Sequence, residues 1–229
     1  MTNGMKILRG WLVVAAVWWC NPVIWAQQTY PKDIYYDDPP IPVKFKGGSP
    51  GIKDFATAYF KSDIMPEIWG SACDAWKNYL RKTPQEKGSK ILFDAKNGFI
   101  RYEFDANEAY GDGDEEKDYV EMCYWNCADG KHKIFATNCK CELNGKHVMT
   151  EYCGPDFYLY DNARHTMCRI ASEGIGAYVS GESEGSNIPV VVYSLPRKGK
   201  NIGIIIQYDT RNEKKQLVWD GMRFRLNQE

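Results

Sequence analysis

The sequence has no excess of basic residues. Its 229 residues include 29 Lys and Arg against 30 Asp and Glu, which gives a formal net charge of −1. Proteins that bind a nucleic-acid backbone need a surplus of positive charge to replace the counterions around the phosphates. The balance of charges therefore argues against a nucleic-acid partner.

The sequence also lacks an apolar run long enough to cross a membrane. Its longest uninterrupted run is Trp11–Trp19, whereas a membrane-spanning helix needs about 20 apolar residues. Lys6 and Arg9 precede this run, and Ala26 follows it. That order is typical of a secretory signal peptide over residues 1–26 with cleavage after Ala26, so we expect no stable membrane span.

Cys20 offers a second interpretation of the same segment, as the attachment site of a lipoprotein anchor. Such an anchor requires a small residue before the cysteine, and Trp19 occupies that position. Cleavage after Ala26 is therefore the favoured interpretation. We expect the protein in the periplasm or outside the cell, soluble or loosely associated with the envelope.

The exported chain would run over residues 27–229 and would carry 27 basic and 30 acidic residues, a net charge of −3. A chain of this length can bury roughly 70% of its unfolded surface, which favours one domain. Residues 27–50 are rich in Pro and Tyr and predict an extended lead-in without regular structure. Residues 51–229 are expected to form a single α+β domain.

Helical signals are confined to residues 51–83. Ser49 and Pro50 form a helix start, and Thr83 with Pro84 ends the segment. Between them, two groups of apolar residues recur at helical spacing, which predicts a pair of helices. The residues of the two apolar faces are Ile52, Phe55, Ala56, Tyr59, Phe60, Ile68, Trp69, Ala72, Cys73, Trp76, Tyr79 and Leu80.

No ten-residue helical pattern follows this pair. Short alternating runs meet instead at Asn97-Gly98, Asp129-Gly130 and Asn144-Gly145, and these dipeptides are strong hairpin signals. The pattern predicts a curved, meandering antiparallel sheet over residues 90–226. The fold class expected is α+β, with the N-terminal helical pair packed on that sheet.

Seven cysteines remain after residue 26. Cys73 lies on an apolar helix face and is expected to be a buried free thiol. The other six lie close together in the sequence, which in an exported protein favours disulfides. These disulfide candidates are Cys123, Cys127, Cys139, Cys141, Cys153 and Cys168. Six cysteines allow 15 connectivities, so the pairing stays open.

A metal site is an alternative use of part of this cluster. Two-residue turns at Asp129-Gly130 and Asn144-Gly145 would place both Cys123 and Cys153 opposite Ala136. One sheet face would then carry Cys123, Cys127, His132, His147 and Cys153, with Cys139 and Cys141 on the other. Four such side chains could bind zinc, although the spacing matches no familiar zinc module. A β-bulge near Cys139 would reverse these faces.

Residues 105–118 are strongly acidic and raise the question of a calcium loop. Starting the EF-hand template at Asp105 puts Tyr110 where glycine is required, and starting it at Asp112 puts Lys117 there. Both alignments fail. A solvated hairpin loop is the preferred interpretation, with calcium binding left open.

Several segments of the predicted sheet have a familiar pattern: Glu121–Asn126, Ala128–Lys131, Phe157–Asp161, Leu195–Ile202 and Leu217–Gly221 with Phe224. Together they resemble small exported proteins of unknown function from Gram-negative anaerobic bacteria. The resemblance covers roughly residues 90–226 and implies export and an antiparallel β architecture. It supplies no catalytic residue, and the dense cysteines of this chain depart from the pattern.

No catalytic constellation stands out in the sequence, and no cofactor is indicated. We therefore predict an exported, non-catalytic protein that binds an envelope or extracellular ligand or partner. One alternative is a cell-envelope hydrolase that uses a pair of carboxylates, which sequence spacing alone does not test. A second alternative is a Cys/His metal-binding protein.

Overall fold

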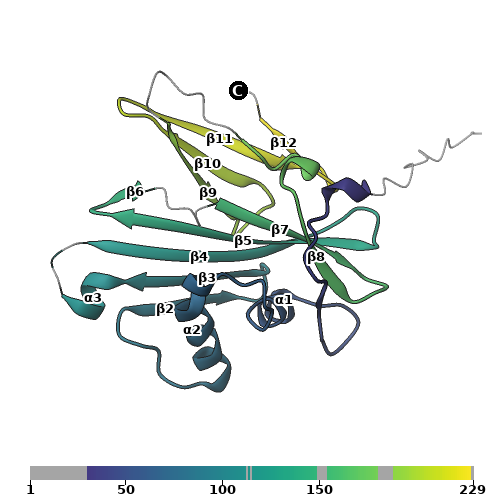
Figure 1. Ribbon diagram of the computed structural model, residues 1–229, viewed down its shortest axis with the longest axis horizontal. Helices are drawn as coiled ribbons and strands as arrows, with labels where there is room; N and C mark the ends of the chain where they lie inside the picture. Colours follow the sequence, from purple (N-terminus) through teal and green to yellow (C-terminus); the bar gives the residue numbers. More distant parts are fainter. Residues whose placement is uncertain (1–29, 112, 114, 149–153, 180–187, 228–229) are drawn as a thin grey trace, which may run out of the picture.

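The computed structural model describes residues 30–111, 113, 115–148, 154–179 and 188–227 (Figure 1). The expected signal peptide with its cleavage site after Ala26 lies outside these residues, as does Cys153. The chain combines helices with antiparallel strands, as predicted from the sequence. None of the helices among the described residues is both long and apolar enough to span a membrane.

The segment before residue 51 has more structure than the sequence predicts. It contains a 3-10 helix, η1 (Lys32–Ile34), and a short strand, β1 (Ile41–Pro42), which is an edge strand of the larger sheet. Tyr30 is buried, and its hydroxyl donates a hydrogen bond to the carbonyl of Met222 at 2.8 Å. The expected lead-in without regular structure is therefore wrong in this part, because its apolar side chains are anchored in the body of the protein.

Two helices follow, α1 (Ile52–Tyr59) and α2 (Gly70–Arg81), with a 3-10 turn, η2 (Glu67–Trp69), leading into α2. The carboxylate of Asp54 accepts a hydrogen bond from Gly51 at the start of α1. Phe55 is fully buried, and its ring lies 5.6 Å from Phe135 of the sheet. The two helices lie on the same side of the larger sheet (Figure 1).

Within the described residues, the larger sheet has eight strands, all paired antiparallel, in the order β1-β8-β7-β5-β4-β3-β2, with β6 paired to β5. Its remaining strands are β2 (Ser89–Asp94), β3 (Phe99–Asp105), β4 (Glu116–Asn126), β5 (His132–Leu143), β6 (Lys146–Val148), β7 (Gly154–Asp161) and β8 (Thr166–Ile170). The three predicted hairpins occur where expected. At Asn144-Gly145 both residues have positive φ, 52° and 73°, which suits a tight turn between twisted strands.

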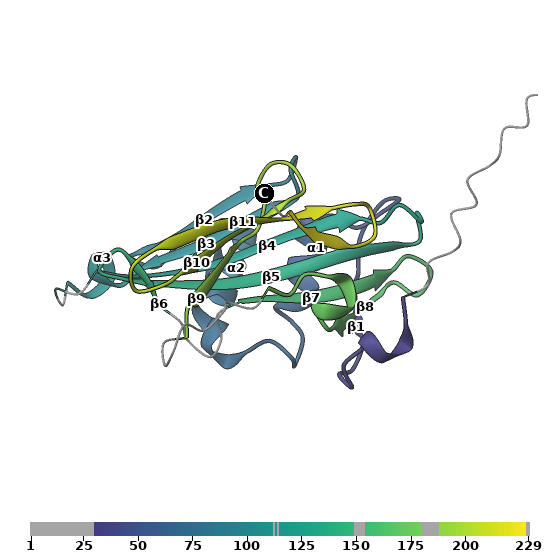
Figure 2. The same ribbon diagram turned by 90° about the horizontal axis from the view of Figure 1, so that it is seen from above.

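A second sheet of four strands lies across one face of the larger one (Figures 1 and 2). Its strands are β9 (Val190–Ser194), β10 (Ile202–Gln207), β11 (Asn212–Trp219) and β12 (Phe224–Leu226), preceded by the 3-10 helix η3 (Glu173–Ile175). The single sheet expected over residues 90–226 is therefore divided in two. The division is physically reasonable because a large sheet with two apolar faces needs a cover on each side.

The larger sheet has an inner face, which faces the small sheet, and a helix face, which faces α1 and α2. Each face has its own hydrophobic core. Trp125, Ile134 and Phe157 point from the inner face toward the small sheet, where Trp125 lies 5.1 Å from Phe224 between ring centroids. Phe135 and neighbouring side chains point the other way and contact the helices. This alternation along β4 and β5 is the ordinary consequence of strand geometry.

Candidate functional site

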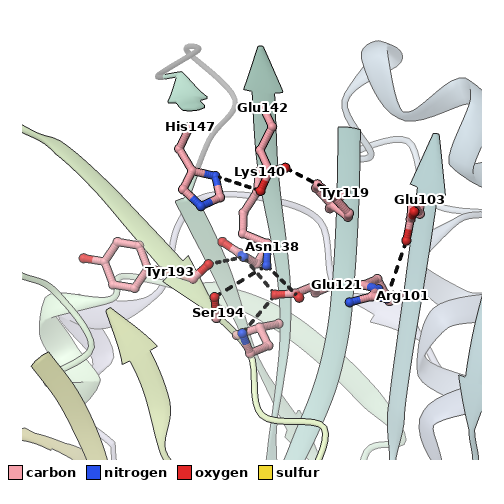
Figure 3. Close-up of polar contacts among 11 residues, drawn as sticks. Arg101, Glu103, Tyr119, Glu121, Asn138, Lys140, Glu142, His147, Tyr193 and Ser194 are labelled. Carbon is pink, nitrogen blue, oxygen red and sulfur yellow. Dashed lines mark hydrogen bonds and ion pairs between the residues drawn. The ribbon is translucent and has the colours of Figure 1, made fainter. Parts of the chain in front are cut away.

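The inner face changes from apolar to polar along the strands. Following alternate residues of β5, Ala136 and Asn138 are 0% exposed, whereas the side chains of Lys140 and Glu142 are 13% and 28% exposed. We call this polar half of the inner face the polar strip (Figure 3). Its members are Arg101, Glu103, Tyr119, Glu121, Asn138, Lys140, Glu142 and His147.

Glu121 forms the buried end of the polar strip. One of its carboxylate oxygens lies 2.8 Å from the ammonium group of Lys140, and the other accepts a hydrogen bond from the backbone N–H of Leu195 at 3.0 Å. Asn138 donates to the same carboxylate at 3.3 Å and to the carbonyl of Tyr193 at 2.9 Å. These bonds attach the small sheet to the larger one, so this end of the strip has a structural role.

Tyr119 lies beside this ion pair on the inner face. Its hydroxyl donates to Glu142 at 3.3 Å, and the ammonium group of Lys140 lies 5.6 Å from the centre of its ring. Burial, followed by the charges of Glu142 and Glu103, raises the pKa of Tyr119 to about 12. The phenol therefore stays protonated at physiological pH and serves as a hydrogen-bond donor.

Glu142 and His147 form the exposed end of the strip. A carboxylate oxygen of Glu142 lies 3.4 Å from His147 Nδ1, at an ion-pair distance but without the direction of a hydrogen bond. The buried Nδ1 therefore has no hydrogen-bond partner among the described residues. Buried polar atoms are usually satisfied, so an unsatisfied one in a side chain that also borders a hollow is a candidate ligand contact.

His147 also lines a hollow between the two sheets. We call it the inter-sheet hollow; it has a volume of about 690 Å³ and opens to solvent. Its walls come from the β5–β6 hairpin, from the start of β9 and from the β10–β11 hairpin. The lining residues are Gly145, Lys146, His147, Ile188, Pro189, Val190, Gln207, Tyr208, Asp209, Thr210 and Asn212. Its size is within the range of ligand pockets, roughly 300–1,000 Å³.

Three carboxylates of the strip, those of Glu103, Glu121 and Glu142, could be considered as the pair of a hydrolase. Each lies beside a cationic or basic side chain. Those partners are Arg101 at 3.5 Å, Lys140 at 2.8 Å and His147 at 3.4 Å. A hydrolase of this kind needs one carboxyl group that carries a proton to give to the leaving group. Here Glu103 and Glu121 are paired with cations, and Glu142 lies beside a histidine side chain.

The expected disulfides are not found among the described cysteines, none of which is joined to another. Cys123 and Cys127 lie on the inner face, whereas Cys139 and Cys141 lie on the helix face, so the sheet separates the two pairs. Cys168 lies opposite Leu159 on β7, away from the others. Cysteines on opposite faces of a sheet cannot be bridged. Cys123 and Cys127 share a face, but they are four residues apart along extended chain, about 13 Å at roughly 3.3 Å per residue, which is too far for a disulfide. Cys73 is a buried free thiol.

The two inner-face thiols are poorly suited to nucleophilic or metal chemistry. Burial raises the pKa of Cys127 to about 12, and burial likewise raises the pKa of Cys123 well above its ordinary value. The Sγ atom of Cys127 lies 3.5 Å from the hydroxyl of Tyr30 in the core. Reactive cysteines need the thiolate form, which these surroundings disfavour.

The candidate metal ligands are not brought together. Cys127 lies opposite His132, and Cys123 opposite Ala136, as predicted. His147, however, pairs with Glu142 at the far end of β5, about 33 Å from His132 at roughly 3.3 Å per residue. No group of three or more ligand-type side chains suited to a metal occurs within the described part of the chain.

The predicted register also fails on the far side of the β5–β6 hairpin. Ala136 lies opposite Phe157, where the sequence predicts Cys153. The β5–β6 and β5–β7 pairings differ by four residues, because Cys141 pairs with Val148 whereas Cys139 pairs with Gly154. This four-residue change in register depends on the pairing of β5 with β7. A prediction from local turn residues does not include that pairing.

The acidic segment 105–118 contains a short helix, α3 (Ala106–Tyr110), where a hairpin loop was expected. The Asp105 carboxylate accepts a hydrogen bond from the N–H of Glu108 at 3.0 Å and lies 3.5 Å from Lys117. Asp112 and Asp114 lie outside the described residues. The Asp105 carboxylate therefore caps a helix and pairs with a lysine.

Sequence reasoning missed the polar strip, although a signal for it was present. Residues 101 and 103, 119 and 121, and 138, 140 and 142 are polar at a period of two, and the residues between them are apolar: Tyr102, Val120, Cys139 and Cys141. Such a pattern indicates a face that turns from core to solvent along its length. The inter-sheet hollow had no such signal, because its walls come from distant segments. Comparisons with protein-family models, curated proteins and solved structures found no match to this chain.

Proposed function

We propose that the protein is an exported, non-catalytic binding protein whose ligand site is the inter-sheet hollow. The observation that carries the proposal is the position of His147. It joins the polar strip to the hollow, and its buried Nδ1 has no hydrogen-bond partner among the described residues. Pockets of this size with a few convergent polar groups are the usual form of a small-molecule site.

The proposal of export rests on the leader pattern of residues 1–26 and on the resemblance to small exported proteins of Gram-negative anaerobes. The position of Tyr30 is consistent with it. Cleavage after Ala26 would leave a short segment before Tyr30, whose side chain is anchored in the core. The proposal also treats α1 and α2 as a pair that backs the curved sheet on the face opposite the hollow.

The non-catalytic part of the proposal rests on the pairing of charges. The carboxylates of Glu103, Glu121 and Glu142 each lie beside a basic partner, and the buried thiols of Cys123 and Cys127 have raised pKa values. Catalytic sites usually contain groups whose protonation is tuned for proton transfer or attack. A site of paired charges beside an open hollow is better suited to recognition.

The test uses the exported chain recovered from the periplasm of an expression host and labelled for NMR. It is titrated with a panel of peptidoglycan fragments, neutral oligosaccharides, acidic oligosaccharides and short peptides. We expect at least one compound to shift the amide signals of residues 145–147 and 207–212, while mass spectrometry finds that compound unchanged. No shift in the hollow with any compound would contradict the binding function. A product whose formation stops in Glu142→Gln would establish a hydrolase instead.

A further inference from the structure

We propose that the inter-sheet hollow takes a neutral, hydroxyl-rich ligand, of which the end of an uncharged oligosaccharide is the chemical type. This inference rests on the proposed binding function and names the ligand class of the same site. Three properties of the hollow point to it: the kind of polar groups in its walls, the balance of charge around it, and the aliphatic surface at its edge.

The polar groups of one wall are mainly uncharged. Gln207 and Asn212 contribute amide groups, and Thr210 and Tyr208 contribute hydroxyl groups. Amides and hydroxyls can each donate and accept hydrogen bonds, as the hydroxyls of a sugar do. A wall of this composition can form hydrogen bonds with the hydroxyl groups of a ligand that carries no charge.

The charges near the hollow are balanced in sign. The guanidinium of Arg211 lies 3.4 Å from Glu213 and 4.6 Å from the centre of the Tyr208 ring, and Lys215 lies 3.3 Å from the same glutamate. Within the wall itself, Lys146 and Asp209 carry opposite charges. A site for an anionic ligand would require a surplus of cations, which this arrangement does not provide.

Aliphatic surface borders these polar groups. Ile188 is 79% exposed, and the half-buried Val190 also lines the hollow. Sugar rings present C–H surface together with hydroxyl groups, so a wall with adjacent aliphatic and amide groups can cover both. Burial of exposed apolar surface such as that of Ile188 favours the complex.

His147 adds one directed contact. An imidazole nitrogen can donate or accept a hydrogen bond, and the Nδ1 atom of His147 has no hydrogen-bond partner among the described residues. A ligand hydroxyl can pair with this side chain, which contributes a hydrogen bond that an apolar ligand would not form. This contact orients a hydroxyl-bearing ligand at the junction of the hollow and the polar strip.

The decisive experiment compares two glutamines near the same hairpin. Gln207 lines the hollow, whereas Gln216, on the neighbouring strand β11, does not. The exported chain is titrated calorimetrically with a neutral oligosaccharide series and with a matched series that carries uronic acids. We expect the neutral series to bind more tightly, and Gln207→Ala to weaken that binding about tenfold, the effect of one lost hydrogen bond. Gln216→Ala should change the affinity for the neutral oligosaccharide by less than about twofold. Both variants should unfold at the same denaturant concentration.

The outcomes separate this inference from the proposed function. If only acidic oligosaccharides or peptides shift the amides of the hollow, the neutral-ligand inference is overturned and the binding function stands. If neither series nor any peptide affects those amides, both are overturned. Equal weakening by Gln207→Ala and Gln216→Ala would place the sugar site elsewhere.

Discussion

The carboxylate of Glu121 accepts a hydrogen bond from the backbone N–H of Leu195 at 3.0 Å, although 74 positions of sequence separate the two residues. Glu121 belongs to the larger sheet, and Leu195 directly follows β9 of the small sheet. The same carboxylate lies 2.8 Å from Lys140. One buried acidic side chain thus connects the two sheets at the buried end of the polar strip.

Replacement of Glu121 should therefore weaken the whole fold. Glu121→Ala leaves the Lys140 ammonium group and the Leu195 N–H without their shared acceptor in a buried setting. Loss of one partner of a buried pair costs about 3–5 kcal/mol. We expect this loss in the free energy of unfolding measured by urea denaturation. Glu103→Ala, which removes a more exposed partner of Arg101, should cost less than about 1 kcal/mol. Equal losses in the two variants would contradict the role of Glu121.

The thiols provide a second prediction. In native protein at mildly alkaline pH, Cys123 and Cys127 should resist alkylation, because burial raises the pKa of both and sets that of Cys127 at about 12. In concentrated guanidinium without a reductant, Cys73, Cys123, Cys127 and Cys168 should all react. Peptide mapping by mass spectrometry measures both states. A requirement for reduction at Cys123, Cys127 or Cys168 would show a disulfide and restore the bridged arrangement expected from the sequence.

The third prediction concerns the Asp94 carboxylate and the pH dependence of the free energy of unfolding. The Asn97 side chain donates to it at 2.9 Å and so does Arg197, and these bonds hold its pKa below the ordinary value of 3.8. Because the pKa is lower in the folded state, the ionised Asp94 carboxylate stabilises the fold at pH values above its ordinary pKa. This stabilisation is lost as the pH falls through the lowered pKa of the folded state.

Asp94→Asn should therefore reduce the free energy of unfolding at neutral pH, and its difference from the parent protein should shrink in acid. Urea denaturation over a series of pH values measures this difference. Arg197→Gln removes only one of the two partners and should reproduce the effect with a smaller amplitude. A difference that stays constant down to the most acidic pH would contradict the assignment.

A pair of glycines supplies a fourth prediction. Gly176 and Gly130 have nearly the same φ, 68° and 66°, so a side chain costs each a similar conformational strain of about 1–2 kcal/mol. A Cβ at Gly176 would lie 2.3 Å from the carbonyl oxygen of Phe224, whereas nothing lies within 4 Å of one at Gly130. Gly176→Ala should therefore lose about 1–3 kcal/mol more than Gly130→Ala in thermal or urea unfolding. Equal losses would mean that the loop before β9 moves away from β12 without cost.

Local sequence patterns predicted much of the secondary structure. The hairpins at Asn97-Gly98, Asp129-Gly130 and Asn144-Gly145 occur as expected, because their turns require residues that tolerate positive φ. The position of the Asp129-Gly130 turn also predicts correctly that Cys123 pairs with Ala136 across β4 and β5. Local signals failed where pairing depends on distant segments, as in the β5–β7 register and the placement of β1.

The candidate site could be predicted only in part. The alternation of polar residues around Glu121 and Lys140 is visible in the sequence, but its meaning depends on the small sheet. Leu195 meets Glu121 only because the chain after β8 folds back over the inner face. The inter-sheet hollow joins the β5–β6 and β10–β11 hairpins, which are more than 60 residues apart, and no local rule connects them.

The balance of charge, the leader pattern, the positions of the turns and the period-two alternation of the strands can all be read from the amino-acid sequence. These features depend on the preferences of single residues and their near neighbours. Three other features become visible only in the folded chain: the strands form two sheets, Cys123 and Cys139 lie on opposite faces, and His147 borders a hollow. Those outcomes depend on which apolar faces bury one another, and burial is a property of the whole chain.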